Sequence, residues 1–256
     1  MISVGIDIGS ITAKAAIVKH NKLVGTHLTA TGYQASTAGR RVFNEILEKF
    51  EFSEKDVKSV VATGYGRKSV DFAEKQITEI LCHGAGACFL NPEIKGIIDV
   101  GGQDSKAIAL NSRGEVDNFA MNDKCAAGTG RFLEVMARVM EVDLEDMGDI
   151  SLTASSPSKI SSICTVFAES EVISMISSGQ HKRNNIIAGI HESAAARIAI
   201  LALKIKIQAP VMMTGGVAKN IGMVKALENR LGLNIEVNPS AQENGAIGAA
   251  VLAAKL

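Results

Sequence analysis

Residues 6–15 read IDIGSITAKA, and residues 98–107 read IDVGGQDSKA. The positions that agree at a constant offset of 92 are Ile6 and Ile98, Asp7 and Asp99, Gly9 and Gly101, Lys14 and Lys106, and Ala15 and Ala107. An internal repeat indicates a duplicated architecture before any local pattern is considered. Each copy predicts an apolar strand, a glycine turn that carries one aspartate, a second apolar strand and a polar turn. Two such β-hairpins facing one another across a cleft would form a pair of phosphate-holding loops.

The composition is that of an ordinary globular protein. Of 256 residues, 46% are hydrophobic and 21% are charged, the formal net charge is zero, and tryptophan is absent. A neutral chain with few aromatic residues lacks the basic surface and stacking platforms of a nucleic-acid binder. Asp7 interrupts the N-terminal stretch where a signal peptide needs apolar residues, and residues 186–207 contain His191, Glu192, Arg197 and Lys204. We therefore expect a cytoplasmic protein without a nucleic-acid or membrane partner, whose four cysteines are thiols or metal ligands.

The remaining pattern is α/β. Helical spacing predicts helices at residues 37–50, 77–90, 129–140, 165–178, 184–207, 219–231 and 243–254. Short apolar runs predict further strands at residues 57–63, 211–213 and 234–237. No low-complexity linker divides the chain. We expect a first lobe of residues 1–95, completed by the C-terminal helix 243–256, and a second lobe of residues 96–242.

Three glycine-marked turns follow strands, and the chain contains neither a P-loop nor a Gly-x-Gly-x-x-Gly fingerprint after a strand. Glycine lets backbone amides approach phosphate oxygens closely, and the third turn precedes a helix whose N-terminal amides suit a nucleotide. The predicted nucleotide ligands are Gly9, Ser10, Thr12, Lys14, Gly101, Gly102, Gln103, Ser105, Lys106, Gly215, Gly216, Lys219 and Asn220. Asp7 and Asp99 suit a hydrated Mg²⁺, which keeps several waters and uses few carboxylates.

The order of these turns resembles the actin/sugar-kinase/Hsp70 ATPase superfamily. That resemblance implies a duplicated actin-like (ribonuclease H-like) fold, with two lobes around a cleft that binds ATP or ADP with Mg²⁺. Gln103 and Asp104 are the candidates to orient the attacking water, by analogy with other phosphate-transfer sites. Lys14 and Lys106 either add positive charge near the phosphates or are surface lysines.

Two cysteines stand before predicted helices, Cys125 in NDKCAAGTGRF and Cys164 at the start of CTVFAESE. Helix N-termini stabilise thiolates, and a 4Fe–4S cluster generally needs four of them. Two per chain make a symmetric dimer the economical arrangement. Cys82 and Cys88 are interpreted as small buried residues on a helix. His83, His181 and His191 lack Cys or carboxylate partners at metal-ligand spacing, so we interpret each as structural or exposed.

The two cysteine segments and the GGQDSK loop closely resemble the activators of 2-hydroxyacyl-CoA dehydratases, a family that includes the ATPase subunits of benzoyl-CoA reductase. The resemblance implies a homodimer with one 4Fe–4S cluster ligated by Cys125 and Cys164 of each chain. It also implies ATP-driven single-electron transfer to a separate dehydratase or reductase that carries its own clusters. Reduced ferredoxin or flavodoxin is the expected electron donor. The alternatives are a small-molecule kinase of the same fold and an actin-like assembly protein regulated by ATP.

Overall fold

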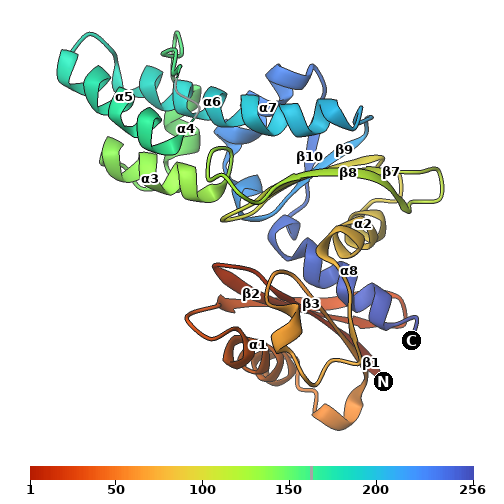
Figure 1. The fold of residues 1–256 in the computed structure, drawn as a ribbon. Coiled ribbons are helices and arrows are strands. Elements are labelled where there is room, and N and C mark those ends of the chain that lie inside the picture. Colours follow the sequence, from red (N-terminus) through yellow and green to blue (C-terminus); the bar gives the residue numbers. More distant parts are fainter. Residues whose placement is uncertain (162–163) are drawn as a thin grey trace. The chain divides into compact units, whose positions relative to one another are not determined.

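Both copies of the repeat open a five-stranded sheet in the computed structural model, which describes residues 1–161 and 164–256. The first sheet has the order β3-β2-β1-β4-β5 and the second the order β10-β9-β6-β7-β8 (Figure 1). The strands of the first are β1 (Ile2–Ile8), β2 (Thr12–Lys19), β3 (Lys22–Ala30), β4 (Val57–Thr63) and β5 (Lys75–Gln76). The strands of the second are β6 (Gly96–Val100), β7 (Ser105–Leu110), β8 (Val116–Asn122), β9 (Val211–Thr214) and β10 (Ile235–Val237). Numbered within each copy, both orders are the same, so the predicted duplication is confirmed.

The chain divides into two compact units, each of which holds most of one sheet. The first unit comprises residues 1–97, 110–118 and 238–256, and the second comprises residues 98–109 and 119–237. The helices are α1 (Ala35–Lys49), α2 (Glu79–Leu90), α3 (Gly130–Met140), α4 (Met147–Leu152), α5 (Thr165–Ser178), α6 (Arg183–Lys204), α7 (Ile221–Leu231) and α8 (Asn244–Ala253). The helix predicted at residues 165–178 has the bounds of α5. The sequence analysis missed α4 because six residues are too few to show helical periodicity.

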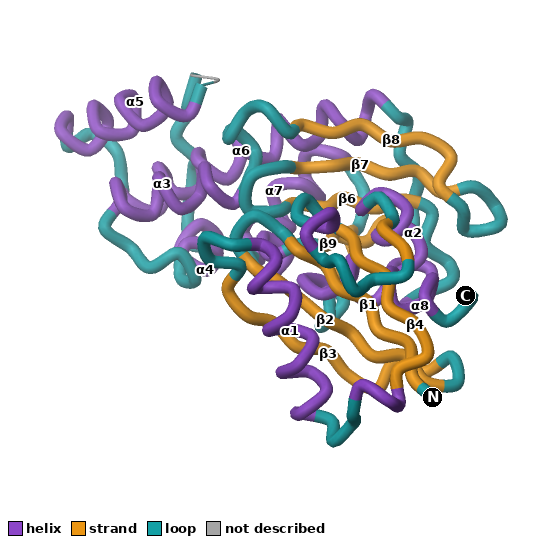
Figure 2. The backbone as a smooth tube through the Cα atoms, turned by 60° about the horizontal axis from the view of Figure 1, so that its bottom comes forward, coloured by secondary structure: helices purple, strands orange, loops and turns teal. Residues whose placement is uncertain are grey.

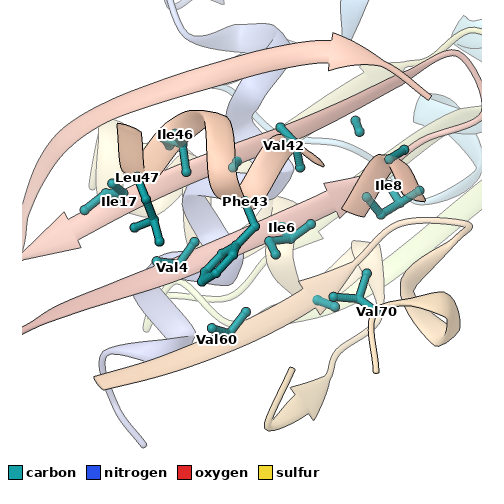
Figure 3. Close-up of a cluster of buried hydrophobic side chains, with 14 of the residues drawn as sticks. Val4, Ile6, Ile8, Ile17, Val42, Phe43, Ile46, Leu47, Val60 and Val70 are labelled. Carbon is teal, nitrogen blue, oxygen red and sulfur yellow. The ribbon is translucent and has the colours of Figure 1, made fainter. Parts of the chain in front are cut away.

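One face of the first sheet packs against α1. Side chains alternate along a strand, so Val4, Ile6 and their even-numbered neighbours on β1 share a face. Figure 3 shows these residues together with Val42, Phe43 and Ile46 of α1, and all of them are buried. Burying an aliphatic side chain of this size contributes roughly 1.5–3 kcal/mol, so this cluster is a main source of the first unit's stability.

The opposite face of the same sheet packs against α8. Gly5 belongs to this face, and a Cβ atom there would lie 2.1 Å from the backbone oxygen of Ala246. The α8 backbone therefore lies directly on the strand. In turn α8 packs against α2, where a Cβ on Gly248 would lie 1.7 Å from the backbone oxygen of Cys82. Because Asp7 has the same strand parity as Gly5, its side chain points toward α8.

The second unit is mainly helical beside its sheet. Among the described helices, α6 alone has the length and apolar composition to cross a membrane, but 61% of its most apolar window is buried inside the structure. Helix α6 packs against α3, α4, α5 and α7, and α3, α5 and α6 lie together in both views (Figures 1 and 2). Helix α6 is therefore a core helix of the second unit.

Candidate functional site

The turns of the two hairpins have the same backbone geometry. The amide of Gly9 donates to the carbonyl of Thr12 at 3.0 Å, and the amide of Gly101 donates to the carbonyl of Asp104 at 2.9 Å. These donors and acceptors correspond at the offset of the repeat. The two stretches that sequence analysis assigns to phosphate binding are therefore equivalent tight turns, each closing the first two strands of its sheet.

In each hairpin the lysine of the repeat forms an ion pair with the aspartate of the repeat. In the first unit Lys14 lies opposite Asp7 across β1 and β2, with Nζ 3.2 Å from Oδ2. In the second unit Lys106 Nζ lies 3.1 Å from Asp99 Oδ2 and 2.8 Å from Asp104 Oδ2. The side chain of Lys106 is 3% exposed and that of Lys14 is 13% exposed. The interpretation of these residues as surface lysines is wrong, because both side chains are largely buried and pair with aspartates at the ends of β1 and β6.

The third glycine turn, which follows β9, contacts the second hairpin. Thr214 Oγ1 donates to Asp99 Oδ1 at 2.8 Å. Gly215 has a φ of +86°, and a Cβ there would lie 2.3 Å from the carbonyl oxygen of Val100. Only glycine combines this left-handed conformation with such close backbone approach. Asp99, Lys106 and the turn at Gly215 thus form one connected arrangement in the second unit.

The first unit has an equivalent third turn that sequence analysis missed. Gly64 follows β4 with a φ of +83°, and a Cβ there would lie 2.3 Å from Asp7 Oδ1. The signal was present, since Thr63-Gly64 and Thr214-Gly215 are the same dipeptide after a buried strand. The hydroxyl of Thr63 lies beside the buried thiol of Cys82, whereas the hydroxyl of Thr214 donates to Asp99.

The other predicted nucleotide ligands differ in exposure. Ser10, Gln103, Gly216 and Lys219 are exposed, whereas Ser105 is buried. Asn220 caps α7, because its Oδ1 accepts from the amide of Met223 at 2.9 Å, and the same oxygen lies 3.0 Å from His191 Nε2. Burial lowers the pKa of His191. All of these positions stay predictions as nucleotide ligands.

The carboxylates of Asp7 and Asp99 suit a Mg²⁺ ion bound through its waters better than a metal ion bound directly by three or more side chains. Within the described residues, no three His, Cys, Asp or Glu side chains gather as a metal site. Asp7 and Asp99 are each paired with an ammonium group, and carboxylate oxygens suit the waters of Mg²⁺. The residues present therefore fit a metal held through its waters.

Two of the four thiols are exposed, Cys125 and Cys164, and both are free. Cys164 is the N-cap residue of α5, as expected. Cys125 lies five residues before α3, which begins at Gly130, one residue after its predicted start. Cys82 is buried, and that burial raises the pKa of its thiol to about 12. Two exposed thiols per chain fit half of a four-thiolate cluster site.

The Cys125 segment is tied to the second hairpin by backbone hydrogen bonds. The Asn122 side chain donates to the carbonyl of Cys125 at 2.7 Å, which holds the loop. At the start of α3, the amide of Gly130 donates to Gly101 at 2.9 Å and the amide of Arg131 donates to Gly102 at 2.8 Å. Sequence analysis had no means of finding this connection, because the two segments carry no shared pattern.

Comparison with known proteins places this site in context. Residues 4–253 match the BadF/BadG/BcrA/BcrD ATPase family. The chain is 48% identical to the activator of lactoyl-CoA dehydratase from Anaerotignum propionicum over 99% of this chain and 97% of that protein. It is 48% identical to the (R)-2-hydroxyglutaryl-CoA dehydratase activating ATPase from Acidaminococcus fermentans, over the same shares of both chains. A benzoyl-CoA reductase component from Thauera aromatica is 36% identical, over 82% of this chain and 76% of that protein.

Solved structures agree with these similarities. The activator of the 2-hydroxyisocaproyl-CoA dehydratase from Clostridium difficile, with bound ADPNP, is 45% identical with a TM-score of 0.92, over 99% of this chain and 94% of that chain. A ROK family glucokinase from Streptomyces griseus, 13% identical, has a TM-score of 0.61 over the full length of both chains. The second likeness concerns the fold alone, and it confirms the predicted actin-like architecture.

Proposed function

We propose, because this chain belongs to the BadF/BadG/BcrA/BcrD ATPase family, that its ATP hydrolysis drives single-electron transfer to a partner enzyme. Membership in that family confirms the expectation of an ATPase. The proposed partner is a 2-hydroxyacyl-CoA dehydratase or a related benzoyl-CoA-type reductase, the enzymes named for its relatives. Reduced ferredoxin or flavodoxin is the proposed donor of the electron. The zero formal net charge supports the absence of a nucleic-acid partner, and a cytoplasmic location without a membrane partner stays a prediction.

The proposed nucleotide site uses all three turns. Gly9, Ser10 and Thr12 bind phosphate oxygens from one hairpin, while Gly101, Gly102 and Ser105 do so from the other. The ammonium groups of Lys14 and Lys106 offset the charge of the aspartates that hold the waters of Mg²⁺. The residues proposed for the adenosine side are Gly215, Gly216, Lys219 and Asn220.

Of the two candidates to orient the attacking water, Gln103 is favoured. Its side chain is exposed and uncharged, so it is available to hold a water by hydrogen bonds. The carboxylate of Asp104 is instead occupied by Lys106 at 2.8 Å. Asp104 then shapes the turn by anchoring it to the buried ammonium group, and Gln103 positions the water.

The proposed cluster site is shared between two chains. Cys125 and Cys164 are exposed thiols in the same unit, and each chain supplies two of the four thiolates of a 4Fe–4S cluster. When bound, this cluster would supply one-electron redox chemistry to the homodimer. The chain's own contribution is to hold the two thiols on segments that respond to the nucleotide.

The observation that carries this proposal is the direct bonding between the second phosphate turn and the Cys125 segment. The carbonyls of Gly101 and Gly102 accept the first two amides of α3. A Cβ on Gly130 would lie 3.3 Å from the Cα of Gly102, so the two segments are in close contact. A turn that changes when the terminal phosphate leaves must move the start of α3 or lose these bonds. Coupling follows if ATP and ADP favour different positions of that turn.

The deciding experiment is anaerobic purification with measurement of iron, sulfide and mass in solution. We expect about two iron atoms per chain in a dimer, which is one shared 4Fe–4S cluster. Oxidation of reduced flavodoxin in the presence of the partner should then depend on ATP. A chain that binds no iron after anaerobic reconstitution would instead indicate a small-molecule kinase, and polymers formed on adding ATP would indicate an actin-like assembly protein.

A further inference from the structure

Glu171 ends the cysteine segment CTVFAESE, yet it is neither a nucleotide ligand nor a cluster ligand in the proposed function. It lies on α5, seven residues after Cys164, the N-cap residue of that helix. Seven residues make almost two full turns, so Glu171 and Cys164 share one side of α5. Side chains of a helix lean toward its N-terminus, and the Glu171 side chain therefore leans toward the end that carries the cysteine.

The carboxylate of Glu171 accepts three hydrogen bonds from Ser161. The amide of Ser161 donates to Oε1 at 3.0 Å and to Oε2 at 3.1 Å, and the Ser161 hydroxyl donates to Oε1 at 2.9 Å. Hydrogen bonds to an ionised acceptor are roughly twice as strong as those between neutral groups. Ser161 precedes Cys164 by three residues, so the contact with Glu171 closes a loop of the chain that contains this thiol.

The chain before Ser161 is fixed on α6. The amide of Ser158 donates to the carbonyl of Asn185 at 2.8 Å, and the Ser158 hydroxyl lies 3.0 Å from Nδ1 of His181. A Cβ on Gly189 would lie 2.0 Å from the carbonyl oxygen of Ser158, so the chain lies directly against the α6 backbone at this point. Ser158 is buried, whereas Ser161 is exposed and is held by the side chain from α5.

Cys125 is held by a comparable contact. Nδ2 of Asn122, the last residue of β8, donates to the carbonyl of Cys125 at 2.7 Å and to the carbonyl of Ala127 at 3.2 Å. Each exposed thiol of the second unit therefore lies on a segment that a polar side chain from a strand or helix holds in place. For Cys164 that side chain is the carboxylate of Glu171.

We infer that Glu171 is a positioning residue for Cys164. By fixing Ser161 it limits the positions that the Cys164 thiol takes up, and it thereby favours binding of iron by this thiol. The inference rests on the part of the proposed function that makes Cys125 and Cys164 cluster ligands. Groups that orient a metal ligand are worth roughly ten- to a hundredfold in metal affinity or activity. Glu171 is thus expected to act on retention of the cluster and to leave nucleotide binding unaffected.

The test compares Glu171→Ala and Glu171→Gln with Glu169→Gln in the anaerobically reconstituted full-length protein. We expect Glu171→Ala to release iron to a chelator roughly tenfold faster than wild type, because Cys164 detaches more readily, while ADP affinity stays at the wild-type value. Glu171→Gln keeps one oxygen acceptor, so its release rate should lie between those of wild type and the alanine variant. Glu169→Gln removes a charge from another half-buried position of α5, and it serves as the matched control. A wild-type release rate in Glu171→Ala would overturn the inference, and so would an equally fast release in Glu169→Gln.

A second measurement requires neither iron nor ATP hydrolysis. In the iron-free protein, amide hydrogen exchange followed by NMR should be slower at Ser161 in wild type than in Glu171→Ala, because the amide is bonded to the carboxylate. Glu169→Gln should leave the exchange rate at Ser161 unchanged. Equal rates in wild type and Glu171→Ala would overturn the inference. Slow exchange at Ser161 in a wild-type protein that binds no iron would instead refute the proposed cluster and leave the contact between Glu171 and Ser161 standing.

Discussion

The two hairpins of the repeat share their strand order, their turn hydrogen bond and their aspartate–lysine pair, but they differ in what surrounds the pair. In the second unit Lys106 neutralises two carboxylates and is 3% exposed. In the first unit Lys14 pairs with Asp7 alone and is 13% exposed. Duplication has preserved the groups expected to face the nucleotide, while the groups behind them have diverged. The more deeply buried hairpin is also the one bonded to the cysteine segment.

This difference assigns separate tasks to the two units. A tightly held turn with direct bonds to α3 is suited to transmit a change at the nucleotide, because packed elements shift as units and do not deform gradually. The first hairpin is instead backed by α8. We therefore expect substitutions at equivalent positions of the two hairpins to have unequal effects.

The largest expected effect is on the iron content of the protein, because both proposed cluster ligands, Cys125 and Cys164, lie in the second unit. Cys125→Ala should reduce the iron content of the anaerobically reconstituted protein from about two atoms per chain to near zero, because four thiolates are needed. Nucleotide binding should persist. Cys88→Ala, which removes a half-buried thiol of the first unit that contacts the carbonyl of Gly114, is the matched control. A full iron complement in the Cys125 variant would contradict the ligand assignment.

The aspartate–lysine pairs should differ in their contribution to folding. Lys106→Met leaves Asp99 and Asp104 without their buried counter-ion, and removing one partner of a buried pair costs about 3–5 kcal/mol. Lys14→Met uncovers a single, less buried carboxylate and should cost about 1–2 kcal/mol. Urea unfolding followed by circular dichroism measures both values. Equal losses in the free energy of unfolding for the two variants would show that the burial of the lysine does not set the contribution of its ion pair to stability.

The threonines before the third turns provide a finer test. Thr214→Val should lower the free energy of unfolding by about 1–2 kcal/mol, because Asp99 Oδ1 loses a buried donor. Thr63→Val is nearly isosteric and removes a hydroxyl whose neighbour is the weakly hydrogen-bonding thiol of Cys82, so its effect should stay within about 0.5 kcal/mol. The same denaturation experiment compares the pair. A larger loss at Thr63 would reverse the proposed difference between the units.

A further effect depends on pH. Burial lowers the pKa of His191 below its ordinary value of 6.5, so the unfolded chain binds this proton more readily than the folded protein. Stability should therefore fall as the pH drops below about 6.5, with a slope of at most about 1.4 kcal/mol per pH unit from this group. His191→Gln should flatten that dependence in denaturation experiments between pH 5 and pH 8, and His181→Gln, an exposed histidine of the same unit, should not. An unchanged slope would show that other groups cause it.

Local patterns predicted much of the fold. The repeat predicted paired hairpins because a strand, a glycine turn and a strand are read from alternation within about ten residues. Helices α5 and α7 were predicted to within two residues of their ends by the spacing of apolar side chains. The family was identified from the cysteine segments and is confirmed, whereas the individual site residues stay predictions.

The misses have a common physical cause. His83 and Asn244 are 161 positions apart, and Thr214 and Asp99 are 115 apart, so no periodic pattern relates them. The bonds from Gly130 and Arg131 to Gly101 and Gly102 likewise join segments that share no pattern.

The sequence by itself determined the duplicated α/β architecture, the family and the set of candidate residues, because short-range periodicity and motif identity are written along the chain. Only the tertiary structure decided which groups support each aspartate, that both lysines are paired, and that Gly101 and Gly102 bind the start of α3. Those contacts depend on how closely distant elements pack. Packing is the sum of many weak interactions across the chain, and glycines such as Gly5, Gly245 and Gly248 act there by the space they leave free.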